Sequence, residues 1–218
     1  MTGERRIEFR VMDSNARSLI RSQFAELEQD LGIDGIGTVL TTAVLELVEN
    51  AVRANLKRAY FRRHGYDLDD RESYARGIEA FRQSYADIKD ESYVTALREL
   101  ELSVAVEVDR NRERLMIFVR NNALLAGTEE ARIRRQLGRA MESDKFVDFY
   151  SDYGDETEGS GLGLAMIVFL IRTLGFNPEN FRVFRLGPAT IARLEFPMHT
   201  DYVPIRDRWR QMQEQPTG

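Results

Sequence analysis

The sequence predicts a single α/β domain, because helical and strand patterns of apolar residues share one chain of 218 residues. Apolar residues recur at helical spacing up to Leu31, and again in a segment that begins near Thr38. They alternate with polar residues over 102–108 and form a continuous run over 115–119, the patterns of a half-buried and a fully buried strand. A chain of this length has room for one large domain, or for one domain with an insertion.

Composition excludes several classes of function. The net charge of −5 and the pI near 5.3 leave no basic surface of the kind that binds nucleic acid, so we expect no nucleic-acid partner. The absence of cysteine excludes disulfides and thiolate metal sites. The longest apolar run, residues 165–171, is too short to span a bilayer, and the polar start lacks the apolar core of a signal peptide. We therefore expect a cytoplasmic protein without a membrane partner.

The N-terminal part of the chain predicts one strand followed by two helices. The strand covers residues 7–12, and Asp13 or Ser14 can cap the helix that runs to Leu31. Glycines then mark a loop before the helix that begins near Thr38.

The C-terminal part predicts a hairpin, further helices and a closing pair of strands. The hairpin joins the strands at 102–108 and 115–119 through a polar turn. Residues 126–158 predict one amphipathic helix and an acidic loop, and an apolar helix from Leu162 to Leu174 follows with Gly175 as its stop. Two last strands precede a polar tail, residues 199–218, which has one aromatic anchor, Trp209.

The first polar motif lies on the helix from Thr38, where Glu46, Asn50 and Arg53 are spaced i, i+4 and i+7 and so share one face. A carboxylate there can take a proton from water or a hydroxyl. An amide oxygen one turn away can coordinate Mg²⁺ without adding charge. An arginine on the same face can hold a phosphate with its fork of donors. The alternative is the solvated face of an ordinary amphipathic helix.

The second motif is a run of alternating glycines, Gly159, Gly161 and Gly163, at the start of the apolar helix. Glycine lets the backbone approach phosphate oxygens closely, and a helix N-terminus supplies free N–H groups and the positive end of a dipole. The dinucleotide fingerprint is excluded because an acidic loop, not a strand, comes before the glycines. A P-loop is excluded because no lysine and hydroxyl residue follow them. The alternative is a flexible linker.

The order of these motifs resembles that of the histidine-kinase/gyrase/MutL (GHKL) ATPase superfamily. The helix with Glu46, Asn50 and Ala51 is similar to its N box, and residues 159–164 are similar to its second glycine box. The strand that ends at Asn121 lies where the superfamily has an Asp-x-Gly-x-Gly box that recognises adenine. The match covers roughly residues 36–55 and 100–198, and looks nearest to the anti-sigma-factor serine kinases.

This resemblance implies a Bergerat-type ATP-binding fold, a two-layer α/β sandwich in which helices cover one face of a mixed β-sheet. It implies a signalling ATPase or protein kinase with ATP and Mg²⁺ as cofactors. Glu46 would be the catalytic base, Asn50 the metal ligand and Arg53 a phosphate contact. Asn121 would meet the adenine, and the phosphate cradle would be Gly159, Ser160, Gly161, Leu162 and Gly163.

Two departures keep a second function open. Asn121 replaces the aspartate that reads adenine, so a hydrogen bond to the base would lack charge assistance. Ala123 and Leu125 replace flexible glycines, and their side chains would crowd the base. The alternative is a catalytically silent module of the same fold, which binds a protein partner without nucleotide.

Residues 56–98 predict a helical insertion directly after the helix with Glu46. Apolar residues recur there in a helical stripe made of Tyr74, Ile78, Phe81, Tyr85 and Ile88. Tyrosine and arginine are enriched at interface hot spots, so we expect the insertion to contact a protein partner, a regulator or phosphoacceptor, with Tyr60, Phe61 and Tyr66 exposed. The alternative is that these aromatic residues only pack the insertion onto the domain.

Overall fold

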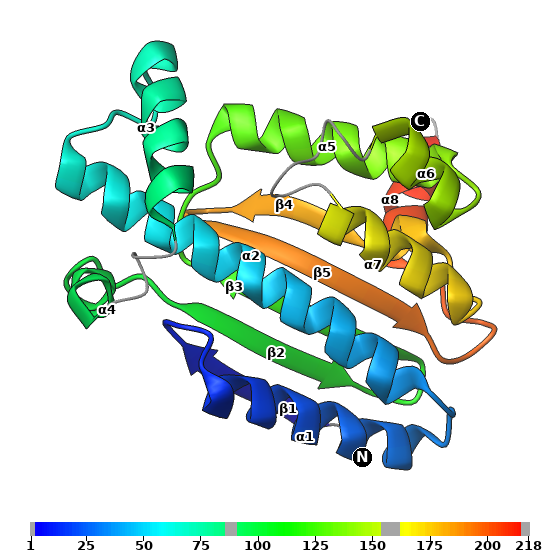
Figure 1. The fold of residues 1–218 in the computed structure, drawn as a ribbon. Helices are drawn as coiled ribbons and strands as arrows, with labels where there is room; N and C mark the ends of the chain where they lie inside the picture. Colours follow the sequence, from blue (N-terminus) through cyan, green and yellow to red (C-terminus); the bar gives the residue numbers. More distant parts are fainter. Residues whose placement is uncertain (1–2, 86–90, 154–161, 215–218) are drawn as a thin grey trace.

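The computed structural model describes residues 3–85, 91–153 and 162–214, and its centre is a five-stranded sheet with helices against one face (Figure 1). The spatial order of the strands is β1-β2-β3-β5-β4. The strands are β1 (Gly3–Phe9), β2 (Val104–Arg110), β3 (Arg114–Asn121), β4 (Arg182–Leu186) and β5 (Ala189–Pro197). The first strand therefore begins and ends earlier than residues 7–12, where the sequence placed it.

Every pair of neighbouring strands is antiparallel, so the expectation of a mixed sheet is wrong for this part of the chain. Two pairs, β2–β3 and β4–β5, are hairpins, which can only be antiparallel. The pair β1–β2 is antiparallel because two consecutive helices carry the chain along the sheet and back, so that β2 starts beside the end of β1, with Phe9 opposite Val104.

The helix layer consists of α1 (Ser14–Leu31), α2 (Ile36–His64) and α7 (Leu162–Thr173). The side chain of Asp13 accepts a hydrogen bond from the backbone N–H of Ala16, as the sequence predicted for its helix cap. Gly175 ends the last of these helices, as predicted, with φ 77° and its N–H bonded to the carbonyl of Arg172. The predicted bounds of the first and third helices are thus close to those observed.

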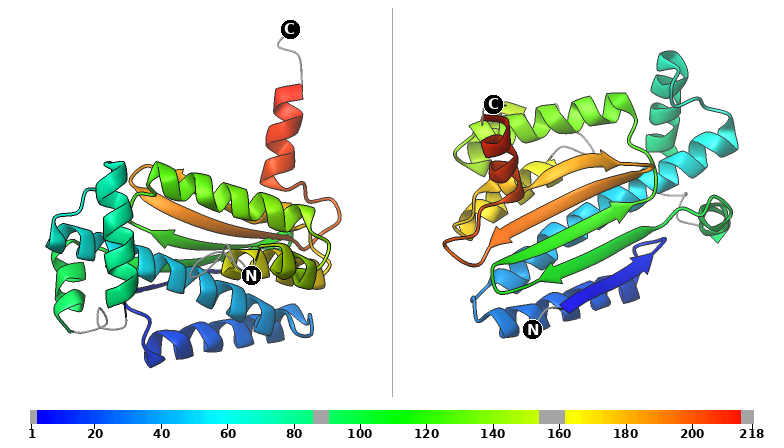
Figure 2. Two further views of the ribbon diagram at one scale, coloured as in Figure 1. Left: turned by 45° about the horizontal axis from the view of Figure 1, so that its top comes forward. Right: turned by 180° about the vertical axis from the view of Figure 1, so that it is seen from behind.

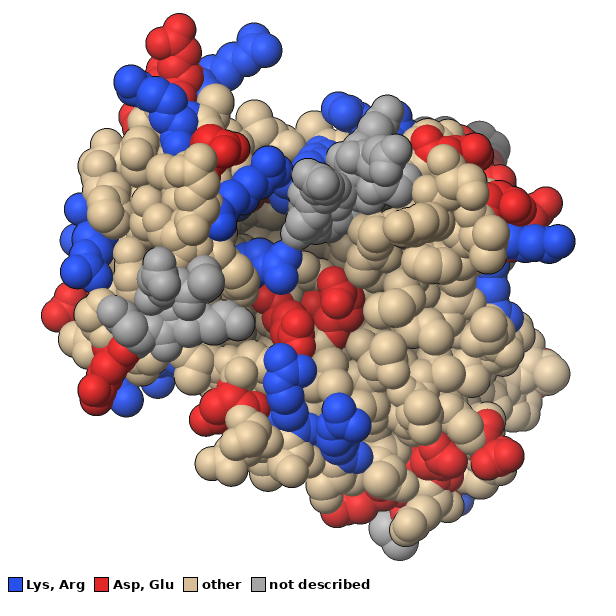
Figure 3. Space-filling model, in the orientation of Figure 1, with Lys and Arg blue, Asp and Glu red and all other residues tan. Residues whose placement is uncertain are grey.

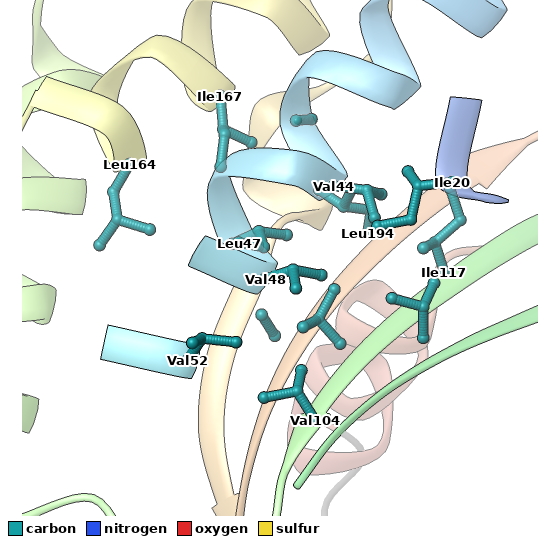
Figure 4. Close-up of a cluster of buried hydrophobic side chains, with 14 of the residues drawn as sticks. Ile20, Val44, Leu47, Val48, Val52, Val104, Ile117, Leu164, Ile167 and Leu194 are labelled. Carbon is teal, nitrogen blue, oxygen red and sulfur yellow. The ribbon is translucent and has the colours of Figure 1, made fainter. Parts of the chain in front are cut away.

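A single apolar cluster joins this layer to the sheet. The alternating residues Val104, Val106 and Val108 of β2 face the helices, and their neighbours across the strand pair are Asn121, Val119 and Ile117. Figure 4 shows side chains of α2 meeting those of the central strands and of α7, with Leu47, Val48 and Ile167 among them. Burial of this face is what holds α2 over the middle of the sheet.

Helix α2 runs through the first part of the expected insertion without a break and ends at His64. Two further helices, α3 (Arg71–Ser84) and α4 (Glu91–Glu99), pack against its C-terminal end (Figure 1). Ile88 of the expected helical stripe lies outside the described residues.

The aromatic residues of this region form a packed cluster. Tyr60 and Phe61 are 5% and 1% exposed, so the expectation that they lie outside is wrong. Their rings contact those of Tyr66, Tyr74, Phe81 and Tyr93 at centroid distances of 5.5–6.4 Å. Tyr74, Ile78 and Phe81 lie on a helix, α3, as their spacing predicted. Tyr60 and Phe61 belong instead to α2, where their rings face this cluster and are buried.

Residues 127–153 form two helices where the sequence predicted one, α5 (Gly127–Glu142) and α6 (Phe146–Tyr153). The first ends at Glu142 and is followed by Ser143, whose hydroxyl donates to the carbonyl of Arg139. The guanidinium of Arg172 donates to the carbonyls of Met141 and Ser143, which satisfies the last carbonyls of the helix.

The polar tail contains a helix, α8 (Ile205–Glu214), that projects from the body of the molecule (Figure 2). Trp209 is 62% exposed, so the expectation that it anchors the tail is wrong. The tail is instead attached by polar contacts at its start, where Glu195 accepts from the Tyr202 hydroxyl at 2.8 Å and from the Ile205 N–H at 2.9 Å. No helix in the described ranges combines the length and apolarity needed to cross a bilayer.

Replacement of Tyr202 by phenylalanine tests this attachment. We expect the free energy of unfolding to fall by about 1 kcal/mol, because Glu195 is 2% exposed and loses one of its donors. Burial and the bond to Glu195 raise the pKa of Tyr202 to about 12, so its contribution is present below the unfolded value of about 10 and is lost as pH rises towards 12. Urea denaturation should show the difference from wild type shrinking above pH 10. Tyr150→Phe, at an exposed site, is the control.

Candidate functional site

Glu46 and Asn50 form a hydrogen-bonded pair on α2. The Asn50 side-chain N–H donates to Oε1 of Glu46 at 2.8 Å, and the two residues lie on one face of the helix, as the i, i+4 spacing predicted. With its nitrogen tied to Glu46, the amide of Asn50 keeps its oxygen available, and Asn50 lines a cavity between α2, α3 and α5. The pair therefore presents a carboxylate and an amide oxygen side by side, which suits proton transfer and a hard cation.

Gly163 brings α7 against this pair. A Cβ at residue 163 would overlap the carboxylate of Glu46 and come within 2.9 Å of its Cγ. Only glycine lets the first turn of α7 approach the carboxylate so closely. The two motifs that the sequence singled out, far apart along the chain, are thus in contact.

The cavity that Asn50 lines has a volume of about 380 Å³, and we call it the outer cavity. Four basic side chains line it, Arg53, Lys57, Arg82 and Arg132, against one acidic side chain, Glu129, although the whole chain has a net charge of −5. Figure 3 shows a recess beside α3 with basic side chains at its rim and acidic side chains next to them. Such a site attracts an anion.

A buried ion cluster forms one wall of the outer cavity. Glu129 of α5 contacts Lys57 and Arg58 of α2, the latter at 2.6 Å, and all three side chains are at most 11% exposed. Burial and the positive charges of Arg58 and Arg132 lower the pKa of Lys57, and contact with Glu129 opposes this shift. Arg58 also donates to the carbonyl of Leu124 at 2.7 Å and so fixes the turn that leads into α5.

A smaller cavity of about 100 Å³, the inner cavity, lies between α2 and the sheet and shares Asn50 and Leu125 with the outer one. Asn121 lines it, but both ends of its amide are used: the oxygen accepts from the Ala123 N–H at 2.9 Å and the nitrogen donates to the Ala51 carbonyl at 3.2 Å. Ala123 and Leu125 are buried and line the same space.

The structure therefore brings together most, but not all, of the predicted site. Arg53 lines the outer cavity, and its guanidinium lies over the ring of Tyr85 at 5.1 Å. Leu162 begins α7, and its side chain packs against the core rather than into a cavity. The remaining predicted cradle residues, Gly159, Ser160 and Gly161, lie outside the described residues.

Sequence reasoning missed Lys57, Glu129 and Gln136, all of which line the outer cavity. The signal for Lys57 was present, since it continues the i, i+4, i+7 spacing of Glu46, Asn50 and Arg53 by one more turn. It was overlooked because residue 56 was taken as the start of a separate insertion. Glu129 and Gln136 have no local signal, because only the packing of α5 brings them to the site.

Comparison with known proteins adds little to this geometry. No family model matches the chain, and no solved structure matches it significantly. A curated protein of Treponema pallidum (strain Nichols), described as an uncharacterized protein, is 28% identical over 172 residues, which is 78% of this chain and 33% of that protein. The chain thus spans about a third of the length of this relative, whose description names no activity.

Within residues 3–85, 91–153 and 162–214, no three acidic or histidine side chains cluster as a metal site.

Proposed function

We propose that this chain is a Mg-ATP-binding signalling ATPase or protein kinase with the Bergerat-type fold of the GHKL superfamily. The observation that carries the proposal is the contact of three residues on two helices: Glu46 is hydrogen-bonded to Asn50 on α2, and it lies against Gly163 at the start of α7. This contact lies beside a basic cavity on the helix-covered face of an antiparallel sheet.

The donors at this site fit a magnesium ion that is shared with phosphate oxygens. Mg²⁺ takes few protein ligands and completes its shell with phosphate and water oxygens. Asn50 supplies one neutral oxygen, and its nitrogen is held by Glu46. In the proposed reaction Glu46 takes the proton of the attacking hydroxyl, and Arg53 donates to phosphate oxygens. Bound Mg²⁺ would offset phosphate charge and hold the phosphates in place.

The fit to the base of a nucleotide is poorer, and this favours a second candidate function. The inner cavity is small, and Asn121 already donates and accepts structural hydrogen bonds. One lone pair of its oxygen and one N–H of its nitrogen are left to meet adenine, in the geometry that the two structural hydrogen bonds fix. A catalytically silent module that binds a protein partner is therefore the alternative function.

Under either function we propose a cytoplasmic protein that acts on or through another protein. The aromatic residues of the helical region after α2 do not support a protein contact there, because their rings are packed against one another. The exposed helix α8, on which Trp209 and Met212 are 62% and 68% exposed, is the surface that supports it better.

Two variants at the hydrogen-bonded pair test the enzyme proposal. Glu46→Gln keeps an oxygen that accepts from Asn50 but removes the base, so we expect Mg-ATP affinity to stay near wild type and turnover to fall about 10²–10⁴-fold. Asn50→Ala removes the metal ligand, so we expect both to be lost. Calorimetric titration with Mg-ATP and a steady-state phosphate-release assay measure the two quantities separately.

The control is Glu49→Gln, which changes a neighbouring carboxylate of α2 that pairs with Arg17 at 2.6 Å, whereas Glu46 is bonded to Asn50. It should leave both quantities unchanged. Absence of any Mg-ATP binding by the wild type at millimolar concentration would contradict the enzyme proposal and leave the silent module. Equal turnover in Glu46→Gln and wild type would remove the base from the proposal.

A further inference from the structure

The part of the outer cavity away from Asn50 has its own set of polar side chains. Lys57 lies seven residues beyond Asn50 on α2, about 10 Å along the helix axis. Arg82 of α3 and Arg132 and Gln136 of α5 line the same cavity. The proposed function uses none of these four residues, which we call the distal subsite.

The cations of the distal subsite are only partly neutralised by the protein. Glu129 is the carboxylate of this wall, and it already contacts both Lys57 and Arg58. Within the described parts of the chain, neither Arg82 nor Arg132 forms an ion pair, and Nε of Arg132 is buried without a hydrogen-bond partner. Burial, and then repulsion from Arg58 and Arg132, lower the pKa of Lys57, and a bound anion would oppose this shift and favour the charged amine.

Gln136 adds a second, independent observation. Its side chain is 9% exposed, it lines the cavity, and its carboxamide oxygen is buried with no hydrogen-bond partner. Native proteins rarely leave a buried acceptor unsatisfied, and such an exception calls for a partner that the protein itself does not supply. An N–H or O–H group of a ligand in the cavity would be that partner.

We propose that Lys57, Arg82, Arg132 and Gln136 bind an anionic group, a phosphate or carboxylate, that has a hydrogen-bond donor beside it. The three cations hold the anion, and the Gln136 oxygen accepts from the donor. A singly protonated phosphate carries both features, so inorganic phosphate is a suitable probe. The group can belong to a ligand that also reaches Asn50, or to a separate small molecule.

Thermal unfolding with added inorganic phosphate, at constant ionic strength, tests this subsite. We expect the wild-type Tm to rise by about 2–4 °C when phosphate is several times its Kd. The double variant Arg82→Gln/Arg132→Gln should lose this response. Arg76→Gln is the matched control, because Arg76 is exposed on the same α3 helix and does not line the cavity.

Gln136→Leu gives a readout that a purely structural role would not produce. It removes a buried unsatisfied acceptor, so we expect a higher Tm without phosphate but a several-fold weaker phosphate affinity. Asn50→Ala should keep the phosphate response, which separates this proposal from the Mg-ATP proposal. Loss of ATP affinity in saturating phosphate would assign the group to the nucleotide ligand, and simultaneous binding would assign it to a second molecule.

Three results would overturn the distal subsite. They are the absence of any phosphate response in the wild type, an unchanged response in the double variant, and a response that disappears in Asn50→Ala, which would place the phosphate beside α7 instead. All can be obtained whether or not the protein turns over ATP.

Discussion

Replacement of Gly163 by alanine is expected to remove most of the proposed ATP turnover while leaving the protein folded. The added methyl group would occupy the position of the Glu46 carboxylate, and that flexible side chain can rotate away at small cost. Displacement of the base should lower kcat about 10²–10⁴-fold, the usual contribution of a positioned general base. Thermal unfolding should change little, because alanine is also the better helix former.

Gly138→Ala is the matched control for this variant. Gly138 also lies within a helix, α5, and a Cβ there would meet nothing within 4 Å. It should raise stability by up to about 1 kcal/mol and leave turnover unchanged. If Gly163→Ala and Gly138→Ala are equally active, the contact between α7 and Glu46 has no part in the reaction.

Replacement of Glu129 by glutamine is expected to lower the free energy of unfolding by about 3–5 kcal/mol, the usual cost of leaving a buried charge without its partner. Lys57 and Arg58 both lose their counter-ion, although glutamine still offers an oxygen to the Ala126 N–H. Glu130→Gln is the control, because its partner Arg134 is 78% exposed and such surface pairs contribute little. Urea denaturation of the three proteins gives the comparison.

The stability of the wild type should also depend on pH, with a sign that follows from Lys57. Burial and neighbouring arginines lower the pKa of Lys57 to about 6. The unfolded chain keeps this proton up to about pH 10, so between pH 6 and 10 the unfolded state binds more protons than the folded state. Wild-type stability should therefore rise with pH across this interval. Loss of Glu129 removes the carboxylate that opposes the shift, so in Glu129→Gln the rise should begin at a lower pH. A rise that begins at the same pH in both proteins would show that Glu129 does not act on the charge of Lys57.

Much of the fold could be predicted because its helices and strands have local signals. Alternation over 102–108 and the apolar run over 115–119 gave the hairpin, and Asp13 and Gly175 gave the ends of two helices. The direction of β1 relative to β2 could not be predicted in this way, because it depends on how α1 and α2 pack. The end of α2 was missed because an unbroken helix can pass from one packing environment into another without a change in its periodicity.

Only the part of the site that lies on one face of α2 could be predicted from the sequence. The spacing of Glu46 and Asn50 predicted that they share one face of the helix, which their hydrogen bond confirms. Gly163 was expected to approach phosphate, whereas its observed neighbour is Glu46, a contact between helices that no local pattern encodes. The double engagement of Asn121 was likewise invisible, because its two partners are backbone groups rather than side chains.

The continuous core on both sides of His64 limits how the chain can have changed in evolution. Tyr60, Phe61, Phe81 and Tyr93 belong to the same apolar cluster as the residues over the sheet. The helical region after α2 therefore cannot be deleted or replaced without other changes, because its removal would expose the side chains of Tyr60 and Phe61 on α2. Any relative that lacks α3 and α4 must carry compensating substitutions at the positions of Tyr60 and Phe61.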